Sequence, residues 1–218
     1  SIDDIKNLND LSNNILTVGQ VLLLPYNNVN NDNTYVNVNF TSNAASKGGA
    51  LNGYGQSKNN TFEGCSFTDN TATNDGGAIY YKGNITSNVF EKCSFIKNTA
   101  GNNGGAIGTY RSFISNKFNK SQFIRNNATV NGGALYSDGT FNNNVIENTE
   151  FKNNTAANNG GAVYKQSNNN QLTIYNNTFI NNTAAQDGGA INIEGVGANA
   201  VIINCNFTNN TAPKGGAI

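Results

Sequence analysis

The stretch NTAGNNGGAI, residues 98–107, decides the fold because the chain repeats it at a fixed spacing. Close variants, NTATNDGGAI and NTAANNGGAV, begin at Asn70 and Asn154. The Gly-Gly-Ala triplet starts at seven positions, which are 28 residues apart five times and then 27 apart: Gly48, Gly76, Gly104, Gly132, Gly160, Gly188 and Gly215. A period of this length indicates a repeat architecture and has to be settled before any other feature.

Two further columns keep the same register. Each unit has a Phe, with Asn three residues later and Ala five residues later. The Phe column is Phe40, Phe67, Phe95, Phe123, Phe151, Phe179 and Phe207, and the Asn column is Asn43, Asn70, Asn98, Asn126, Asn154, Asn182 and Asn210. Length changes occur only between the Ala and the Gly pair, which indicates a turn there, because loops tolerate deletions and strands do not.

The columns predict short strands separated by corners. Five residues before each Phe the side chain is large and apolar, and the next position is mostly polar, which is the alternation typical of a strand. Gly, Asn or Lys follows, and Gly and Asn tolerate a left-handed corner. The strand then resumes with Phe inward, and an Ile, Leu or Val after the Gly pair begins a third strand. Three short strands and three turns fit one coil of an all-β, right-handed single-stranded parallel β-helix (a solenoid) of about seven 28-residue coils.

Stacked coils, about 4.8 Å apart, explain why the phrase returns. Equivalent residues would lie directly above one another, so Phe would bury area in every coil and Asn amides would hydrogen-bond from coil to coil. The expected structural ladders are Phe67, Phe95, Phe123, Phe151, Phe179 and Phe207, with Asn70, Asn98, Asn126, Asn154, Asn182 and Asn210. Ala and Gly-Gly would occupy a tight corner beside the core.

Composition limits the function classes. Charged residues make up 12% of the chain and the formal net charge is zero, which argues against a nucleic-acid partner and a polybasic membrane surface. No apolar run approaches the length of a membrane span. Because the 218 residues begin without Met and stop within the repeated phrase, the chain is expected to be a fragment of a longer one.

The pair of motifs GGA[ILV] and F-x-x-N, present in all seven units of residues 34–218, resembles the repeat of the polymorphic outer membrane protein family. The adhesin-like surface proteins of methanogenic archaea carry the same pair. The resemblance implies a parallel β-helix, an extracellular location at the cell surface, and a role in adhesion or in the cell envelope.

Residues 1–25 lack the repeat. The spacing of Ile2, Ile5, Leu8 and Leu11 predicts a short helix over 2–12, and the following ILTVGQVLLLP predicts a turn and a strand. The segment resembles the second half of a LysM module, whose family binds N-acetylglucosamine polymers. The first half is missing, so no glycan binding is expected through it. Residues 1–24 could instead fold over the first coil as a cap. Residues 26–33 would be a linker.

Several kinds of chemistry are absent from the sequence. There is no His, which excludes Ser-His-Asp and Cys-His catalysis and most zinc sites, and no cofactor or metal is expected. Asp75 and Asp187 share the column before the Gly pair but lie four coils apart, too far to share glycoside chemistry. Cys65, Cys93 and Cys205 share a column that reads as small and inward, and Cys65 and Cys93 would lie near disulfide distance. The chain is therefore expected not to be an enzyme.

Two surface features remain. Tyr80, Tyr136 and Tyr164 share one column and would be candidate glycan-contact residues if they point outward, or else they simply cover the rod. N-x-S/T sequons, candidate glycosylation sites, occur at Asn39, Asn59, Asn84, Asn127, Asn153, Asn176, Asn181, Asn206 and Asn209.

The sequence therefore predicts the rod of a cell-surface, adhesin-like protein without catalytic activity. Its partner would be a glycan or surface protein of another cell, a cell-wall polymer or, by self-association, a second copy of the chain. One alternative is a self-assembling structural solenoid of a sheath or fibre. Another is the scaffold of a polysaccharide lyase or hydrolase whose site lies outside residues 1–218.

Overall fold

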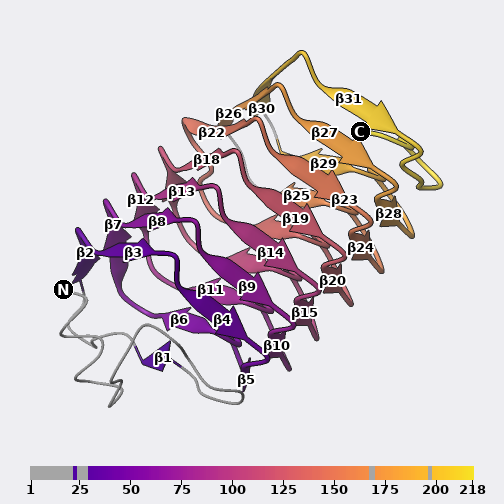
Figure 1. Ribbon diagram of the computed structural model, residues 1–218. Coiled ribbons are helices and arrows are strands. Elements are labelled where there is room, and N and C mark those ends of the chain that lie inside the picture. The colour runs from indigo at the N-terminus through magenta and orange to yellow at the C-terminus, as the bar shows by residue number, and fades with distance from the viewer. Residues whose placement is uncertain (1–21, 24–28, 167–169, 196–197) are drawn as a thin grey trace.

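The computed structural model describes residues 22–23, 29–166, 170–195 and 198–218, and there the chain winds into a parallel β-solenoid of about six turns (Figure 1). Successive turns add short strands to sheets that run along the rod, and three of these sheets have seven strands each. The predicted parallel β-helix is confirmed, and the described residues contain no helix. The helix expected over residues 2–12 lies outside them.

Five sheets make up the walls of the solenoid. Sheet I contains β1 (Leu22–Leu23), β6 (Leu51–Gly53), β11 (Ile79–Tyr81), β16 (Ile107–Thr109), β21 (Leu135–Ser137), β25 (Val163–Gln166) and β29 (Ile191–Glu194). Sheet II contains β2 (Val29–Asn31), β7 (Gln56–Lys58), β12 (Ile85–Thr86) and β17 (Phe113–Ile114). Sheet III contains β3 (Thr34–Val36), β8 (Thr61–Glu63), β13 (Val89–Glu91), β18 (Lys117–Asn119), β22 (Asn144–Glu147), β26 (Asn170–Tyr175) and β30 (Ala198–Ile203). Sheet IV contains β4 (Asn39–Thr41), β9 (Ser66–Thr68), β14 (Ser94–Ile96), β19 (Gln122–Ile124), β23 (Glu150–Lys152), β27 (Thr178–Ile180) and β31 (Asn206–Thr208). Sheet V contains β5 (Ala44–Ala45), β10 (Thr71–Ala72), β15 (Thr99–Ala100), β20 (Asn127–Ala128), β24 (Thr155–Ala156) and β28 (Thr183–Ala184).

The register places equivalent residues of successive turns directly opposite one another. Phe123 pairs with Phe95 on one side and with Phe151 on the other. The two ring centroids nearest to Phe123 in this column lie 4.6 and 4.9 Å away, with the rings almost parallel. All six Phe residues from Phe40 to Phe179 in this column are fully buried, whereas Phe207 is only half-buried, in the last turn of the described chain.

A second aromatic column lies beside the first, on sheet III. Its rings stack in the same way, with centroids of Phe90 and Phe118 4.7 Å apart. Phe118 also meets Phe123 edge to face, with centroids 5.6 Å apart. The two stacks therefore pack against each other across the interior, in a geometry that suits the ring quadrupoles. The large apolar side chains five residues before each Phe form this column and face the interior.

From Asn70 to Asn182, the Asn column uses all the hydrogen-bonding capacity of each amide, whereas Asn43 Oδ1 in the first turn has no partner among the described residues. Asn126 Nδ2 donates to Asn154 Oδ1 at 3.0 Å and to the carbonyl oxygen of Phe95 at 2.9 Å. Asn126 Oδ1 accepts from the backbone N–H and from Nδ2 of Asn98, both at 3.0 Å. The amide bonds connect every turn from Asn43 to Asn210. Since buried polar groups are costly only when they lack partners, the fully bonded part of this column stabilises the rod.

A second Asn ladder, which was not predicted, runs at the corner between sheets II and III. Its buried members are bonded by their amides in the same way: Asn33, Asn60, Asn88, Asn116 and Asn144. The next residue of this column is Leu172, where the amide ladder gives way to an apolar side chain.

Left-handed backbone makes the corners. The corner predicted three residues before each Phe has a positive φ in all seven units, including Lys92 (φ 54°) and Lys120 (φ 49°). A second left-handed corner follows each Phe by two residues, for example at Asp69 and Arg125, and it was not predicted. Left-handed backbone costs a non-Gly residue about 1–2 kcal/mol, so the stacking has to hold Lys and Arg in this conformation.

The corner formed by the Gly pair requires glycine at both positions. Gly104 has a φ of 68°, and a Cβ on Gly105 would come within 2.1 Å of the carbonyl oxygen of Gly133 in the next turn. Backbone from adjacent turns thus approaches too closely for any side chain. The prediction that this corner excludes bulk is confirmed by the glycines and by the buried Ala of sheet V, Ala100 and Ala128.

The structure has more strands per turn than the three predicted. Sheets II and V were missed, because their strands are as short as two residues, as in Thr71–Ala72, and two residues carry no alternation. At the N-terminal end, β1 pairs with β6 and β2 with β7. Most of the LysM-like segment lies outside the described residues, so the LysM-like and cap interpretations stay predictions.

The cysteine column faces inward, as predicted. Cys65 and Cys93 are buried and Cys205 is partly buried, and all three are free thiols. The thiol of Cys93 lies 3.3 Å from the carbonyl oxygen of Phe62, the same place that Ser121 Oγ takes beside Phe90. The column therefore holds a small group that bonds to the corner backbone.

Lys165 is a buried lysine whose pKa reports how strongly the interior of the rod desolvates an amine. It occupies the inward column of sheet I beside Ser137, its side chain is fully buried, and Nζ donates to the carbonyl oxygen of Glu194 at 3.5 Å. Burial lowers the pKa of Lys165 from 10.5 to about 8. Between those values the folded state binds fewer protons than the unfolded state, so this group makes the free energy of unfolding rise with pH.

We expect the free energy of unfolding to rise by on the order of 2 kcal/mol between pH 8 and pH 10.5 relative to Lys165→Met. Urea unfolding of both proteins across this range measures the difference. The buried thiols and tyrosines titrate in both proteins and cancel. If the free energy of unfolding changes with pH in the same way in the parent and in Lys165→Met, the amine is not desolvated in the folded rod.

Candidate functional site

The surface groove that runs along the corner between sheets III and IV is the candidate site. We call it the polar groove. It has a volume of about 460 Å³ and crosses four turns. Its lining residues are Lys92, Cys93, Lys120, Ser121, Gln122, Asn148, Thr149, Glu150, Asn176 and Thr178.

The left-handed corner explains how the groove is lined. Lys92, Lys120, Asn148 and Asn176 occupy the corner itself, and their side chains are exposed. In each turn the residue after the corner faces inward. Gln122 (β19), Glu150 (β23) and Thr178 (β27) then face outward at the start of sheet IV and form the opposite wall.

Hydroxyl groups close the floor of the groove. Thr149 Oγ1 lies 2.8 Å from the carbonyl oxygen of Glu147, to which it donates. Ser121 Oγ lies 3.2 Å from the carbonyl oxygen of Phe90, and Cys93 N donates to Ser121 Oγ at 3.1 Å. The floor thus uses its polar groups internally, and it presents no free hydrogen-bonding group to a ligand.

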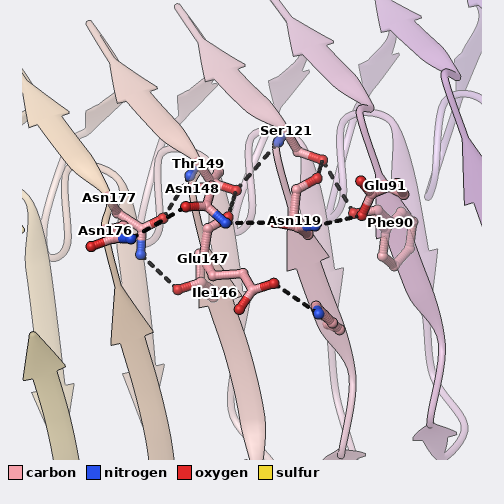
Figure 2. A network of polar contacts seen from close by, with 11 residues as sticks. Phe90, Glu91, Asn119, Ser121, Ile146, Glu147, Asn148, Thr149, Asn176 and Asn177 are labelled. Carbon is pink, nitrogen blue, oxygen red and sulfur yellow. Dashed lines mark hydrogen bonds and ion pairs between the residues drawn. The ribbon is translucent and has the colours of Figure 1, made fainter.

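A chain of side-chain bonds forms the wall on sheet III, as Figure 2 shows. Asn119 Nδ2 donates to Glu91 Oε2 at 2.8 Å, and Asn148 Nδ2 donates to Asn119 Oδ1 at 2.9 Å. Lys117 pairs with Glu147 at 2.8 Å on the same face. Each bond links one turn to the next, so this wall is fixed in position along the rod.

Four side chains of the groove keep unused polar groups. Lys120, Gln122, Glu150 and Thr178 make no side-chain hydrogen bond or ion pair with any residue that the structure describes. They supply an amine, an amide, a carboxylate and a hydroxyl on three successive turns. The groove therefore has a saturated floor and a rim of available donors and acceptors.

The three tyrosines expected as candidate glycan contacts lie elsewhere. Tyr80, Tyr136 and Tyr164 point away from the apolar interior, but they are only 2%, 7% and 3% exposed. The turn before the Gly pair folds over them. Gly76 and Gly160, the first glycines of their pairs, leave no room for a Cβ against the backbone of Tyr80 and the Cβ of Tyr164. These rings have no open face for a sugar, and their burial agrees with the alternative that they cover the rod.

Tyr110 completes the tyrosine column. Gly108 occupies the position equivalent to Tyr80 and Tyr136. The ring of Tyr110 fills that space, with centroids 5.5 and 5.3 Å from those of the two neighbouring tyrosines. Its hydroxyl donates to Asp75 Oδ1. Burial, and then the bond to this carboxylate, raise the pKa of Tyr110.

The column of Asp75 and Asp187 is structural. Its members between them, Asn103, Asn131 and Asn159, form a ladder in which each side-chain oxygen accepts the backbone N–H of the next turn. Asp75 begins the ladder and pairs with Lys47 at 3.7 Å, and Asp187 ends it and pairs with Lys214 at 3.8 Å. Within the described ranges, no three His, Cys, Asp or Glu side chains gather as metal ligands would.

The sequon asparagines all have accessible side chains. Seven are exposed, and Asn127 and Asn153 are half-buried. In the Asn-Asn-Thr sequons of the repeat the second Asn, such as Asn154 or Asn182, belongs to the buried ladder. The side chain of the sequon Asn is therefore accessible on the surface of the rod, whereas that of the ladder Asn that follows it is buried.

Five segments of the chain match the family model of the Chlamydia polymorphic membrane protein repeat. They are residues 64–82, 92–110, 148–166, 178–194 and 204–218, and each contains one F-x-x-N and one GGA[ILV] phrase. Together they cover less than half of the chain. No curated protein and no solved structure matches it significantly. Among the described residues, no helix is long and apolar enough to cross a membrane.

Proposed function

We propose that this solenoid is the rod of a cell-surface, adhesin-like protein that attaches to a glycan or protein of another cell or to a cell-wall polymer. The observation that carries the proposal is the match of five turns to the Chlamydia polymorphic membrane protein repeat. That name places the repeat in membrane proteins, and surface attachment is the role we extend to this chain. The outward side chains of the rod, rather than the repeated phrase, would make the contacts.

The arrangement of ionisable groups supports a role without catalysis. The acids most conspicuous in the sequence, Asp75 and Asp187, are engaged as ladder ends and ion pairs. The carboxylates beside the polar groove are also distributed, with Glu147 paired to Lys117 and Glu91 bonded to Asn119. Glycoside cleavage needs two carboxyl groups on either side of one bond, and the lining residues of the groove include one carboxylate, that of Glu150.

Beads coated with the folded chain test the proposal. We expect them to adhere to a panel of cells and isolated cell walls well above albumin-coated beads, and soluble chain should compete. Incubation with pectin, chitin or peptidoglycan should release no product. Adhesion no greater than that of albumin beads across the panel would rule out the attachment role, and turnover that survives repurification would favour the polysaccharide-degrading alternative.

A further inference from the structure

We propose that the polar groove binds one linear, uncharged polysaccharide chain, lying parallel to the rod axis. This deepens the proposed function and rests on it, because it names the ligand class and the place of attachment. Four observations carry it: the direction of the groove, its closed backbone, its free side chains and its balance of charge.

The direction of the groove suits an extended polymer. Its lining comes from the equivalent positions of four successive turns, Lys92, Lys120, Asn148 and Asn176. Successive turns are about 4.8 Å apart. The groove therefore presents the same kinds of position at a constant interval, which is comparable to the length of one sugar in an extended chain.

The backbone of the groove excludes an added peptide strand. Within sheets III and IV each strand beside the groove pairs with a strand on both sides, as β18 does with β13 and β22. The corner is bonded as well, for example from Lys120 N to the carbonyl oxygen of Glu147 at 3.2 Å. A peptide that binds by strand addition needs an unpaired edge, and the groove offers none.

The free side chains offer both donors and acceptors. Gln122 and Thr178 can each donate and accept, Lys120 donates and Glu150 accepts. Sugar hydroxyls are likewise donors and acceptors, so a chain of them can use this mixture. Aromatic and aliphatic side chains are absent from the lining residues, which disfavours an apolar partner.

The charges around the groove favour a neutral chain. Lys92 pairs with Glu63 at 3.8 Å and Lys117 with Glu147 at 2.8 Å. The remaining free charges of the lining are Lys120 and Glu150, which are opposite in sign. A polyanion would gain from Lys120 and lose at Glu150, whereas hydroxyl groups can bond to both.

Affinity electrophoresis of the folded chain tests this inference. The gels contain hydroxyethyl cellulose, glycol chitin, dextran or polygalacturonate at equal mass. The groove variant is Gln122→Ala/Glu150→Ala/Thr178→Ala. The matched control is Asn39→Ala/Ser66→Ala/Asn206→Ala, which changes the same outward column of sheet IV outside the groove. Thermal unfolding shows that both remain folded, and mobility in a plain gel corrects for charge.

We expect at least one of the three neutral polymers to retard the parent and the control equally. The groove variant should bind that polymer about tenfold more weakly, because three hydrogen-bonding side chains are lost. Equal retardation of the groove variant, no retardation by any neutral polymer, or retardation by polygalacturonate alone would each overturn the inference. If the groove variant on beads still adheres to cells, attachment survives without the groove. If the parent itself fails to adhere, the proposed function fails.

Discussion

Phe123→Ala should destabilise the rod by about 3–5 kcal/mol, the range for large aromatic truncations in a packed core. The ring is fully buried, stacked on Phe95 and Phe151, and in edge-to-face contact with Phe118. Removing it opens a cavity in the middle of the solenoid, where stacked rings on both sides and the second aromatic column prevent collapse. The measurement is urea unfolding of the variant beside the parent.

Two variants serve as controls for this result. Phe207→Ala removes the same ring from the last described turn, where it stacks on Phe179 alone and is half-buried, so the cost should be smaller. Gln122→Ala changes the outward neighbour of Phe123 and should stay within about 0.5 kcal/mol of the parent. If Phe123→Ala proves as mild as Gln122→Ala, the Phe column is not the core of the rod.

Asn126→Leu should cost a similar amount, about 3–5 kcal/mol, although it adds apolar volume to a buried site. The change takes the acceptor from both the backbone N–H and the Nδ2 of Asn98. It also takes a donor from the carbonyl oxygen of Phe95 and from Asn154 Oδ1. Each orphaned buried group costs about 1–3 kcal/mol, so the loss exceeds what Leu gains by burial.

The adjacent Asn127 is the matched control because it faces outward on sheet V and is only half-buried. Asn127→Leu should change the free energy of unfolding by less than about 1 kcal/mol. Thermal and urea unfolding of the two variants give the comparison. Equal effects would mean that the amide ladder contributes no more than an ordinary surface residue.

The sequence predicts the ladders because residues of one type recur at a fixed period, and the period determines where they lie in the solenoid. A Phe or Asn that recurs every 28 residues at constant register must stack on itself in a solenoid, and Phe123 and Asn126 do so. The second Asn ladder carried the same signal, since Asn60, Asn88 and Asn116 are also 28 apart. In an Asn-rich chain that column has no neighbouring apolar landmark, so it does not stand out.

The candidate site could be predicted only in part. The sequence left open whether Tyr80 points outward, and its burial depends on how the turn before the Gly pair folds over sheet I, which no local pattern encodes. The left-handed corner at Lys120 was visible from Gly and Asn in the same column. The groove beside it was not, because its concavity depends on side-chain lengths in four different turns.

Pairwise distances between spin labels test most directly whether one turn of the rod is one 28-residue unit. Label pairs join Asn39→Cys to Glu150→Cys, Thr178→Cys or Asn206→Cys, in a chain whose three natural cysteines are changed to Ser. The outward column of sheet IV places these sites four, five and six turns apart. Stacked turns predict narrow distances of roughly 19, 24 and 29 Å, increasing by about 4.8 Å for each turn. Distances that are broad, or that fail to increase by one strand spacing per unit, would contradict the stacking of 28-residue turns along the rod.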